Sequence, residues 1–316
     1  MKRLGLVGVG VWGRRYIETV SRRNDCRIVA FARASPANDV DVPGAIRCES
    51  WRTMLQLVQR GDVDGIIVAT TPDVQAEIAA AAALAGAPAL VEKPLGLSRK
   101  AADNVLQSWR ESERKPPIVV DYIHLFAPAY RGLKSAVLAT SGGTAAIVDI
   151  ESVGTNKGPF RNWSPLYDYG SHDVALCLDL LGANAPFRVH YARKLPTSAG
   201  LAGELVEASF DLDTVRVSVQ LGNGAAAKSR RFAVTLAGGR TIVYDDCRPH
   251  PFKLVDRGEP IPVSERMPLD AALAYFLERI ALWARGGGDD EHASASLGFA
   301  VRVAAILDAV AEAVGR

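Results

Sequence analysis

The sequence has no excess of charge of one sign and few cysteines, and both absences exclude classes of protein. Its 37 lysines and arginines nearly balance 35 aspartates and glutamates, which leaves a formal net charge of +2. No block of like charge and no basic stripe is present, so nothing favours a nucleic acid or a membrane surface as partner. The four cysteines (Cys26, Cys48, Cys177, Cys247) form no close pair of the kind that binds zinc or exchanges disulfides. We expect reduced thiols in a cytoplasmic protein.

Long apolar runs are also missing. The apolar residues near the start are interrupted by Gly8, Gly10 and Gly13 and then by Arg14 and Arg15, so they do not form the core of a signal peptide. The alanine-rich stretch 79–85 is bounded by Glu77 and Gly86, and no other stretch approaches the length needed to span a bilayer. We expect neither an export signal nor a membrane anchor.

The first part of the chain alternates short apolar runs with amphipathic stretches. This pattern is typical of βαβ units and a parallel sheet, and 316 residues are enough for two domains. Strands are expected at 3–9, 27–32, 65–69, 89–92 and 118–121, and helices at 12–23, 51–60, 74–85 and 98–112. We predict a doubly wound, dinucleotide-binding Rossmann domain over residues 1–121.

The order of the expected helices and strands changes after residue 121. Helices are expected at 129–139, 169–181, 269–285 and 297–314, and period-two alternation predicts strands at 205–212, 215–221, 231–236 and 240–244. Consecutive strands without intervening helices indicate an antiparallel sheet. We predict an α+β domain over residues 122–316 with a mostly antiparallel open sheet, which binds substrate and makes oligomer contacts.

Several residues of this expected sheet supply more apolar surface than one layer of helices can cover. They are Leu205, Val206, Val217, Val219, Val234 and Leu236. Because one face of an antiparallel sheet is often left for other contacts, we predict a homodimer or homotetramer formed through the outer face of the sheet.

A glycine-rich loop lies between the first expected strand and helix. Residues Gly8-Val9-Gly10-Val11-Trp12-Gly13 fit the pattern G-x-G-x-x-G. One glycine permits the tight turn, one lets the backbone approach a pyrophosphate, and one lets the helix pack on the strand. The helix N-terminus then favours the anion. The pattern predicts a dinucleotide site comprising Gly8, Gly10, Val11, Trp12 and Gly13; the alternative is a glycine-rich turn without a ligand.

The end of the second expected strand bears on the choice of cofactor. An acidic residue there would bind the ribose 2′-hydroxyl of NAD. This chain has Arg33 followed by Ser35, and no acid before Asp39. Arg33 can pair with the 2′-phosphate of NADP, and Ser35 can add a hydroxyl donor. The alternatives for Arg33 are stacking on adenine and a solvated surface position. We expect NADP in preference to NAD.

Three further segments resemble those of a known family. Ile66–Pro72 leads into an expected helix, Val91–Leu95 (Val-Glu-Lys-Pro-Leu) follows at the end of the next strand, and Asp168–Asp173 (Asp-Tyr-Gly-Ser-His-Asp) opens a later helix. Together with the glycine loop they resemble the glucose–fructose oxidoreductase / inositol dehydrogenase / MocA family, abbreviated Gfo/Idh/MocA. The resemblance covers the whole first domain and reaches the middle of the second.

The resemblance implies roles for individual residues. Lys93 and His172 would be the catalytic pair, and Asp168 would orient His172 or bind substrate. Glu92 and Lys93 would lie beside the nicotinamide ribose and ring. Three more residues would line the cofactor crevice: Thr70, Thr71 and Pro72. The family also implies an open antiparallel sheet that is commonly used for dimers or larger assemblies.

The residues themselves favour the same assignment. Asp168 and His172 are four apart and so share one face of a helix, where a carboxylate can orient an imidazole and raise its basicity. Lys93 follows a parallel strand at the edge where α/β proteins bind ligands, and an oxidised nicotinamide would disfavour its ammonium form. Taken alone, the Asp168–His172 pair and Lys93 would each be ordinary surface residues. Their occurrence with the glycine loop favours catalysis.

Departures from the family concern the substrate. In Asp121–Phe126, relatives more often carry Gly-x-Asn followed by an arginine, so Tyr122 and His124 are candidates for substrate recognition, with simple packing as the alternative. Gln75 stands where relatives often have histidine, and we expect it to matter little.

The loop expected over residues 154–167 contains Lys157, Arg161 and Trp163. Cationic and aromatic groups together suit a hydroxyl-rich or phosphorylated ligand, and the alternative is an ordinary polar loop. His124, Asp168 and His172 offer ligand atoms for a metal, but no pair has metal-ligand spacing, so we expect no metal.

These patterns predict an NAD(P)-dependent oxidoreductase. Hydride would pass between nicotinamide and a carbinol or carbonyl carbon of a sugar, nucleotide sugar or similar polyol. Two alternatives stay open. One is a non-catalytic, cofactor-sensing regulator, which we would expect to have lost Lys93 and His172. The other is a reductase of imines or other double bonds, for which one acid would suffice.

Overall fold

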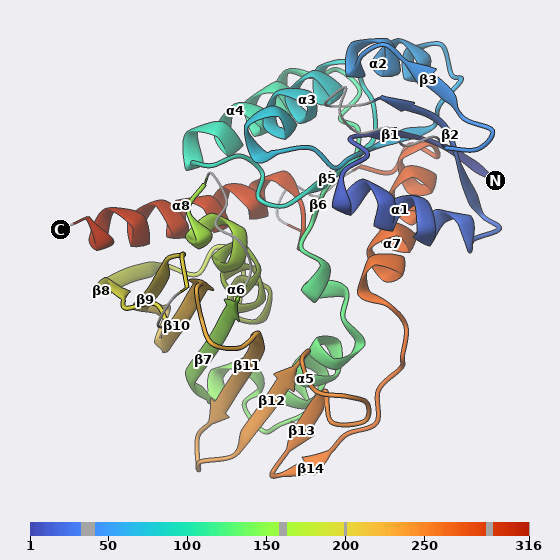
Figure 1. Cartoon of the computed structure of the whole chain (residues 1–316). Helices are drawn as coiled ribbons and strands as arrows, with labels where there is room; N and C mark the ends of the chain where they lie inside the picture. Colours follow the sequence, from blue (N-terminus) through green and yellow to red (C-terminus); the bar gives the residue numbers. More distant parts are fainter. Residues whose placement is uncertain (33–41, 158–162, 199–200, 289–292, 316) are drawn as a thin grey trace. The chain divides into compact units, whose positions relative to one another are not determined.

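The computed structural model describes residues 1–32, 42–157, 163–198, 201–288 and 293–315. The chain forms two compact units, traced in Figure 1. The first comprises Met1–Asp121 and Leu269–Val301, and the second comprises Tyr122–Pro268 and Arg302–Arg316. The sequence-based division into 1–121 and 122–316 had placed residues 269–301 in the second domain. None of the described helices combines the length and apolar character that a bilayer crossing requires.

A parallel six-stranded sheet forms the centre of the first unit. Its strand order is β3-β2-β1-β4-β5-β6. The strands are β1 (Lys2–Val7), β2 (Cys26–Ala32), β3 (Ile46–Cys48), β4 (Gly65–Val68), β5 (Ala89–Glu92) and β6 (Ile118–Asp121). Every residue of β4, β5 and β6 is buried, as in strands that are covered on both faces. The order reverses between β1 and β4, the switch point at which such sheets bind ligands.

Helices connect these strands. They are α1 (Val11–Ser21), α2 (Trp51–Gln59), α3 (Pro72–Leu84) and α4 (Arg99–Glu111). The later helix α7 (Pro268–Trp283) also packs on this sheet. A Cβ atom added at Gly65 would lie 2.9 Å from the Ile280 side chain and 3.2 Å from that of Phe276. The absent side chain at Gly65 therefore allows α7 to lie against β4.

The second unit contains an eight-stranded sheet, ordered β14-β13-β12-β11-β7-β10-β9-β8. Its strands are β7 (Ile147–Asn156), β8 (Phe187–Leu195), β9 (Leu205–Leu212), β10 (Val215–Asn223), β11 (Ser229–Leu236), β12 (Thr241–Asp245), β13 (Leu254–Asp256) and β14 (Glu259–Pro260). The β7–β10 pair is parallel and the other pairs are antiparallel. The predicted fold class, a Rossmann sheet followed by a mostly antiparallel sheet, is confirmed.

Helices α5 (Pro128–Leu138) and α6 (Pro165–Leu181) cover this sheet, and α8 (Leu297–Val314) closes the chain. Two short helices, η1 (Ile123–Phe126) and η2 (Gly143–Ala146), flank α5. Leu221 of β10 and Leu307 of α8 both pack against Gly170 of α6. A Cβ atom at Gly170 would lie 2.9 and 3.0 Å from these two side chains, so the close packing requires glycine there.

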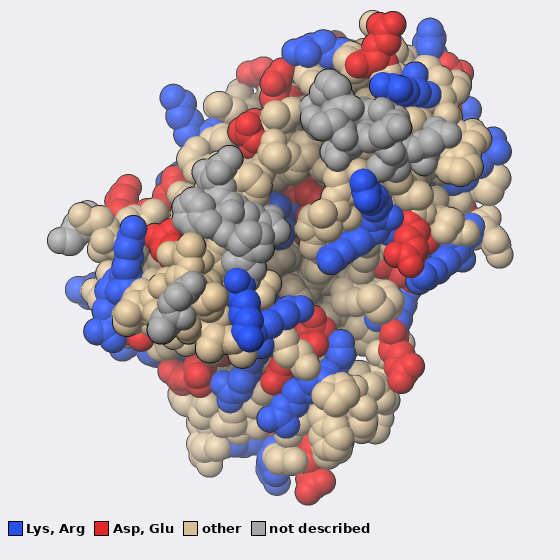
Figure 2. All heavy atoms as spheres, in the orientation of Figure 1, with Lys and Arg blue, Asp and Glu red and all other residues tan. Residues whose placement is uncertain are grey.

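The apolar residues predicted to provide surplus surface on the second sheet do not do so. Leu205, Val206, Val217, Val219, Val234 and Leu236 are each at most 6% exposed within the single chain. The opposite face carries cross-strand ion pairs, including Arg193–Glu207 at 2.9 Å and Arg216–Asp211 at 2.7 Å. Side chains of both charges are also interspersed over the face of the molecule drawn in Figure 2. The interpretation was wrong because these residues are already buried within the single chain.

Candidate active site

The loop between β1 and α1 leaves open space at its middle glycine. Gly8 has a φ of +94°, and a Cβ atom there would lie 2.4 Å from the carbonyl oxygen of Ala69. A Cβ atom at Gly13 would lie 2.1 Å from the carbonyl oxygen of Gly8. At Gly10 an added Cβ atom would meet no atom of the described residues within 4 Å. The fold therefore requires glycine at 8 and 13, whereas Gly10 leaves room for a group from outside the chain.

That open space adjoins the N-terminus of α1. Gly10 caps the helix and has no side chain that could accept from its first N–H groups. An anion can bind such groups, as the pyrophosphate of a dinucleotide does. Val11 is exposed, and Trp12 is half-buried with the Arg15 guanidinium 4.3 Å above its ring. These residues fit a nicotinamide dinucleotide.

Other predicted cofactor residues lie at the same edge of the sheet. Thr70 and Thr71 follow β4, across the switch point from the glycine loop, and Pro72 is the first residue of α3. Arg33 and Ser35 lie outside the described residues.

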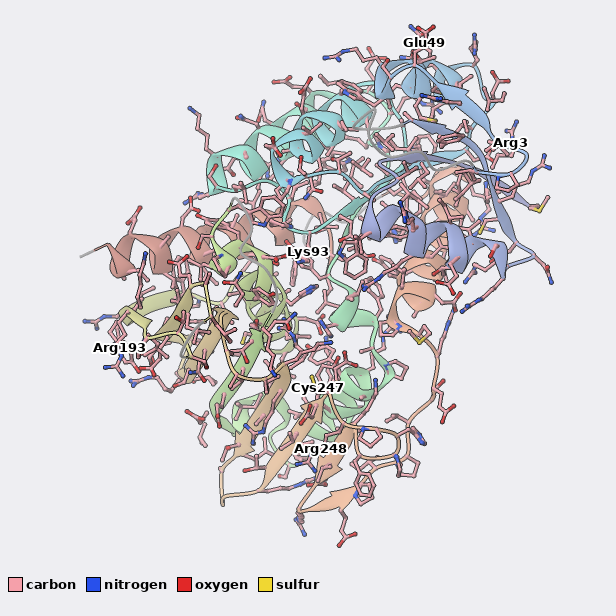
Figure 3. All side chains as sticks on the ribbon, viewed as in Figure 1. Arg3, Glu49, Lys93, Arg193, Cys247 and Arg248 are labelled. Atoms are coloured by element: carbon pink, nitrogen blue, oxygen red, sulfur yellow. The ribbon has the colours of Figure 1, made fainter. Side chains whose placement is uncertain are left out.

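Lys93 follows β5 directly and is labelled in Figure 3. The peptide bond between Lys93 and Pro94 is cis. The buried side chain of Gln75, on α3, donates a hydrogen bond to the Pro94 carbonyl oxygen. Gln75, which was expected to matter little, thus connects α3 to the segment that carries Lys93.

A buried pair of carboxyl groups lies beside Lys93. Glu92 and Asp121 are paired neighbours at the ends of β5 and β6, and they are 4% and 0% exposed. Tyr16, on α1, donates its hydroxyl hydrogen to Asp121 Oδ2. Burial and the adjacent Asp121 carboxylate raise the pKa of Glu92, and burial raises the pKa of Asp121. Asp121 and Tyr16 were not predicted site residues, although Asp121 begins the segment that departs from the family.

Stability should therefore depend on pH. The folded protein holds more protons on this pair than the unfolded chain does, so stability is greatest in mild acid. Stability should fall as the pH rises from the ordinary carboxyl range through the raised pKa values of the pair. Asp121→Asn should weaken this dependence because asparagine does not ionise. Melting temperatures at mildly acidic, neutral and alkaline pH test this, and parallel curves for both proteins would contradict it.

In the second unit, α6 positions two of the predicted catalytic residues. Ser164 caps the helix by accepting a hydrogen bond from the Leu166 N–H at 3.2 Å, and Pro165 is its first residue. Asp168 lies in the first turn, where a carboxylate is favoured by the helix dipole, and His172 lies one turn later; both are buried. The helix begins four residues before the predicted position, and β7 extends to Asn156, so the loop between them is shorter than expected.

His124 lies against His172. The two ring centroids are 4.7 Å apart, with an interplanar angle of 86°. On its other side, His124 Nδ1 lies 2.7 Å from the hydroxyl of Tyr244, on β12. Burial raises the pKa of Tyr244, so its hydroxyl stays protonated. His124 therefore packs in the core and also adjoins the proposed catalytic histidine. Tyr244 was missed because it is 120 residues away and no pattern marks it.

The remaining candidates are less closely grouped. Tyr122 is buried and precedes η1, and burial raises its pKa. Lys157 is exposed just after β7, Trp163 is half-buried just before α6, and Arg161 lies outside the described residues. Within the described ranges, no group of three or more His, Cys, Asp or Glu side chains is arranged to hold a metal ion.

A buried ion pair fixes α6 to the sheet. Asp173 follows His172 and is 0% exposed, and the Arg230 guanidinium of β11 donates to both of its oxygens at 2.9 Å. Ser152 of β7 donates to Asp173 Oδ1 at 2.5 Å. Gly154 leaves room for this pair, because a Cβ atom there would lie 2.8 Å from Arg230 Nη1 and from Asp173 Oδ2. The pair sets how α6 is turned on the sheet, and with it His172.

Comparison with known proteins decides the family. Residues 2–120 match the family model described as oxidoreductase family, NAD-binding Rossmann fold (GFO_IDH_MocA). Inositol 2-dehydrogenase of Rhizobium meliloti (strain 1021) is 28% identical over 229 residues, which are 71% of this chain and 67% of that protein. The rhizopine catabolism protein MocA of Rhizobium meliloti is 26% identical over 241 residues, 73% of this chain and 72% of its own. Residues 2–120 therefore form the NAD-binding Rossmann domain of a Gfo/Idh/MocA oxidoreductase.

Solved structures agree with this Gfo/Idh/MocA fold. A protein of Magnetospirillum magnetotacticum MS-1, described as an oxidoreductase, is 28% identical with a TM-score of 0.80, over 98% of this chain and 99% of that one. The 3-ketoreductase KijD10 of Actinomadura kijaniata, solved with NADP and TDP-benzene, is 17% identical with a TM-score of 0.77, over 99% and 98%. The predicted family and the prediction of a nicotinamide-dependent oxidoreductase are confirmed.

Proposed function

We propose that this oxidoreductase interconverts a carbinol and a carbonyl group on a sugar, nucleotide sugar or similar polyol. The observation that carries the proposal is the open position at Gly10, which adjoins the uncapped N-terminus of α1 and fits the pyrophosphate of NADP or NAD. The relatives named inositol 2-dehydrogenase support a polyhydroxylated substrate.

The chain's own residues would move the protons. When bound, the nicotinamide cofactor accepts or donates the hydride. His172 takes the hydroxyl proton as the carbinol is oxidised and returns it in reduction. Lys93 donates a hydrogen bond or proton to the substrate oxygen, and Asp168 orients His172 or binds a neighbouring hydroxyl. Tyr122, His124, Lys157, Arg161 and Trp163 are the proposed substrate-recognition residues.

The activity can be tested directly. Purified protein would be incubated with NADP⁺ or NAD⁺ and a panel of inositols, sugars and nucleotide sugars, and the near-ultraviolet absorbance of the reduced cofactor would be followed. Turnover with at least one polyol is expected. Cofactor binding without turnover of any panel member, in either direction, would favour the non-catalytic regulatory alternative.

We further propose that NADP(H) binds more tightly than NAD(H). Arg33 would pair with the 2′-phosphate, with Ser35 as an added donor, and one or two charge-assisted hydrogen bonds give about a tenfold to several-hundredfold preference. Arg33→Asp should reverse this preference because a carboxylate repels the phosphate. Titration of both cofactors against both proteins measures it. Equal affinities in the wild type, or an unchanged ratio in the variant, would rule out the phosphate role.

Assembly through the second sheet remains a proposal. Its outer face carries charged cross-strand pairs, so we expect a polar contact between copies, in a homodimer or homotetramer. Analytical ultracentrifugation at micromolar concentration should show a dimer or tetramer as the main species, and a monomer as the main species would contradict the proposal. If the oligomer forms, charge reversal at Arg216, one of these ion-pair residues, should weaken it.

A further inference from the structure

The carboxyl pair of Glu92 and Asp121 is a buried titratable cluster to which the proposed mechanism gives no proton-transfer role. The two residues end adjacent parallel strands in register, so their side chains lie on the same face of the sheet. The groups that face them are Tyr16, from α1, and Lys93, from the turn after β5. One oxygen of each carboxyl group, Glu92 Oε1 and Asp121 Oδ1, accepts no hydrogen bond within the described part of the chain.

This geometry disfavours two negative charges. Two carboxylates at one buried site repel each other, so one of them holds its proton to a higher pH than an isolated group would. The Tyr16 hydroxyl supplies one hydrogen, which it donates to Asp121. A proton on Glu92 would leave Asp121 as the single anion, balanced by Lys93. The pair is therefore built to carry one negative charge.

The position of the pair relates it to the cofactor. A dinucleotide bound with its pyrophosphate at α1 extends to both sides of the switch point, and the β2 side is the adenosine side. The β5 and β6 ends are on the other side, toward which the nicotinamide extends. Tyr16 lies on α1 itself, the helix whose N-terminus would hold the pyrophosphate.

We propose that Glu92 and Asp121 share one proton across the ends of β5 and β6, and that the pair releases this proton to solvent when the oxidised cofactor binds. The inference rests on the proposed function. The oxidised nicotinamide ring is cationic, and a nearby positive charge favours the doubly ionised pair. The reduced ring is neutral and leaves the proton in place. Glu92 and Asp121 are thus positioning residues that compensate charge and stabilise the oxidised cofactor relative to the reduced one.

Isothermal titration calorimetry in buffers of different ionisation enthalpy counts the protons released on binding. For the wild type at neutral pH, the oxidised cofactor should release up to about one proton more than the reduced cofactor does. Asp121→Asn should reduce this difference, because Glu92 then lacks the neighbouring carboxylate that favours its protonated form. Asp121→Asn should also bind the oxidised cofactor less tightly relative to the reduced one.

Two control variants separate the pair from other proton sources. Asp103→Asn changes a partly exposed carboxylate of the same unit, ion-paired with Arg99, and should leave the difference intact. Lys93→Met removes the ammonium group that lies beside the pair. If the Glu92–Asp121 pair is the source of the released proton, Lys93→Met should still release more protons on binding the oxidised cofactor than on binding the reduced one. Loss of the difference in Lys93→Met with retention in Asp121→Asn would overturn the proposal.

A spectroscopic measurement on the cofactor-free protein separates this inference from the proposed function. The infrared difference between wild type and Asp121→Asn at neutral pH should contain the carbonyl stretch of a protonated carboxyl group. Absence of that band overturns proton sharing even if cofactors bind. If neither cofactor binds, the proposed function and the proton-release step are both wrong. The infrared band would still show whether the Glu92–Asp121 pair holds a proton.

Discussion

Lys93→Ala and His172→Ala are each expected to lower turnover by about a hundredfold to ten-thousandfold, the usual contribution of a positioned acid or base. Lys93 directly follows β5, and His172 is buried on α6 in contact with the His124 ring. Steady-state kinetics with the polyol identified in the panel gives the measurement. Cofactor affinity should fall much less for His172→Ala, since His172 belongs to the unit without the glycine loop.

Matched controls use the same residue types at exposed positions. Lys100, on α4, and His190, on β8, are exposed on the first and second units, and their alanine variants should keep nearly full turnover. Thermal unfolding shows whether a variant is folded. If Lys93→Ala and His172→Ala fold normally and retain near-wild-type turnover, the catalytic assignment is wrong.

Local pattern was sufficient to predict most of the fold. The bounds of β5, β6, β9 and α8 agree with the sequence-based ranges because each is an uninterrupted apolar run or a sustained periodic stretch. Short strands such as β3 and β14 carry too few residues to show a period. The association of α7 with the Rossmann sheet depends on contacts between segments more than 200 residues apart, such as those of Gly65 with Ile280 and Phe276.

The candidate site was predictable where a motif brings its residues together in sequence. The glycine loop, Lys93 and the Asp168–His172 pair are of this kind. Tyr244, Tyr16 and Arg230 are not, because each reaches its partner through the pairing of distant elements. Asp173 is instructive because it stood inside the motif that was recognised. Its importance became visible only when the sheet placed Arg230 and Ser152 around it.

Breaking the buried ion pair between Asp173 and Arg230 is expected to have the second large effect. Asp173→Ala should lower the free energy of unfolding of the second unit by about 3–5 kcal/mol, because it leaves the Arg230 guanidinium buried without its carboxylate. Arg230→Met should be comparably destabilising, since it leaves the Asp173 carboxylate buried. The double variant Asp173→Leu/Arg230→Met removes both charges and should regain much of the loss. Urea unfolding measures all three, and hydrogen exchange of α6 peptides locates the effect.

An exposed pair on the same sheet distinguishes burial from pairing. Arg216 and Asp211 lie 2.7 Å apart, but their side chains are 52% and 31% exposed, against 9% and 0% for Arg230 and Asp173. Asp211→Ala should therefore destabilise the fold far less than Asp173→Ala does, because exposed ion pairs contribute little. If Asp173→Ala costs no more than Asp211→Ala, the buried pair does not hold α6. If the cost is large, loss of protection should begin in α6, and turnover should fall because His172 is no longer held in position.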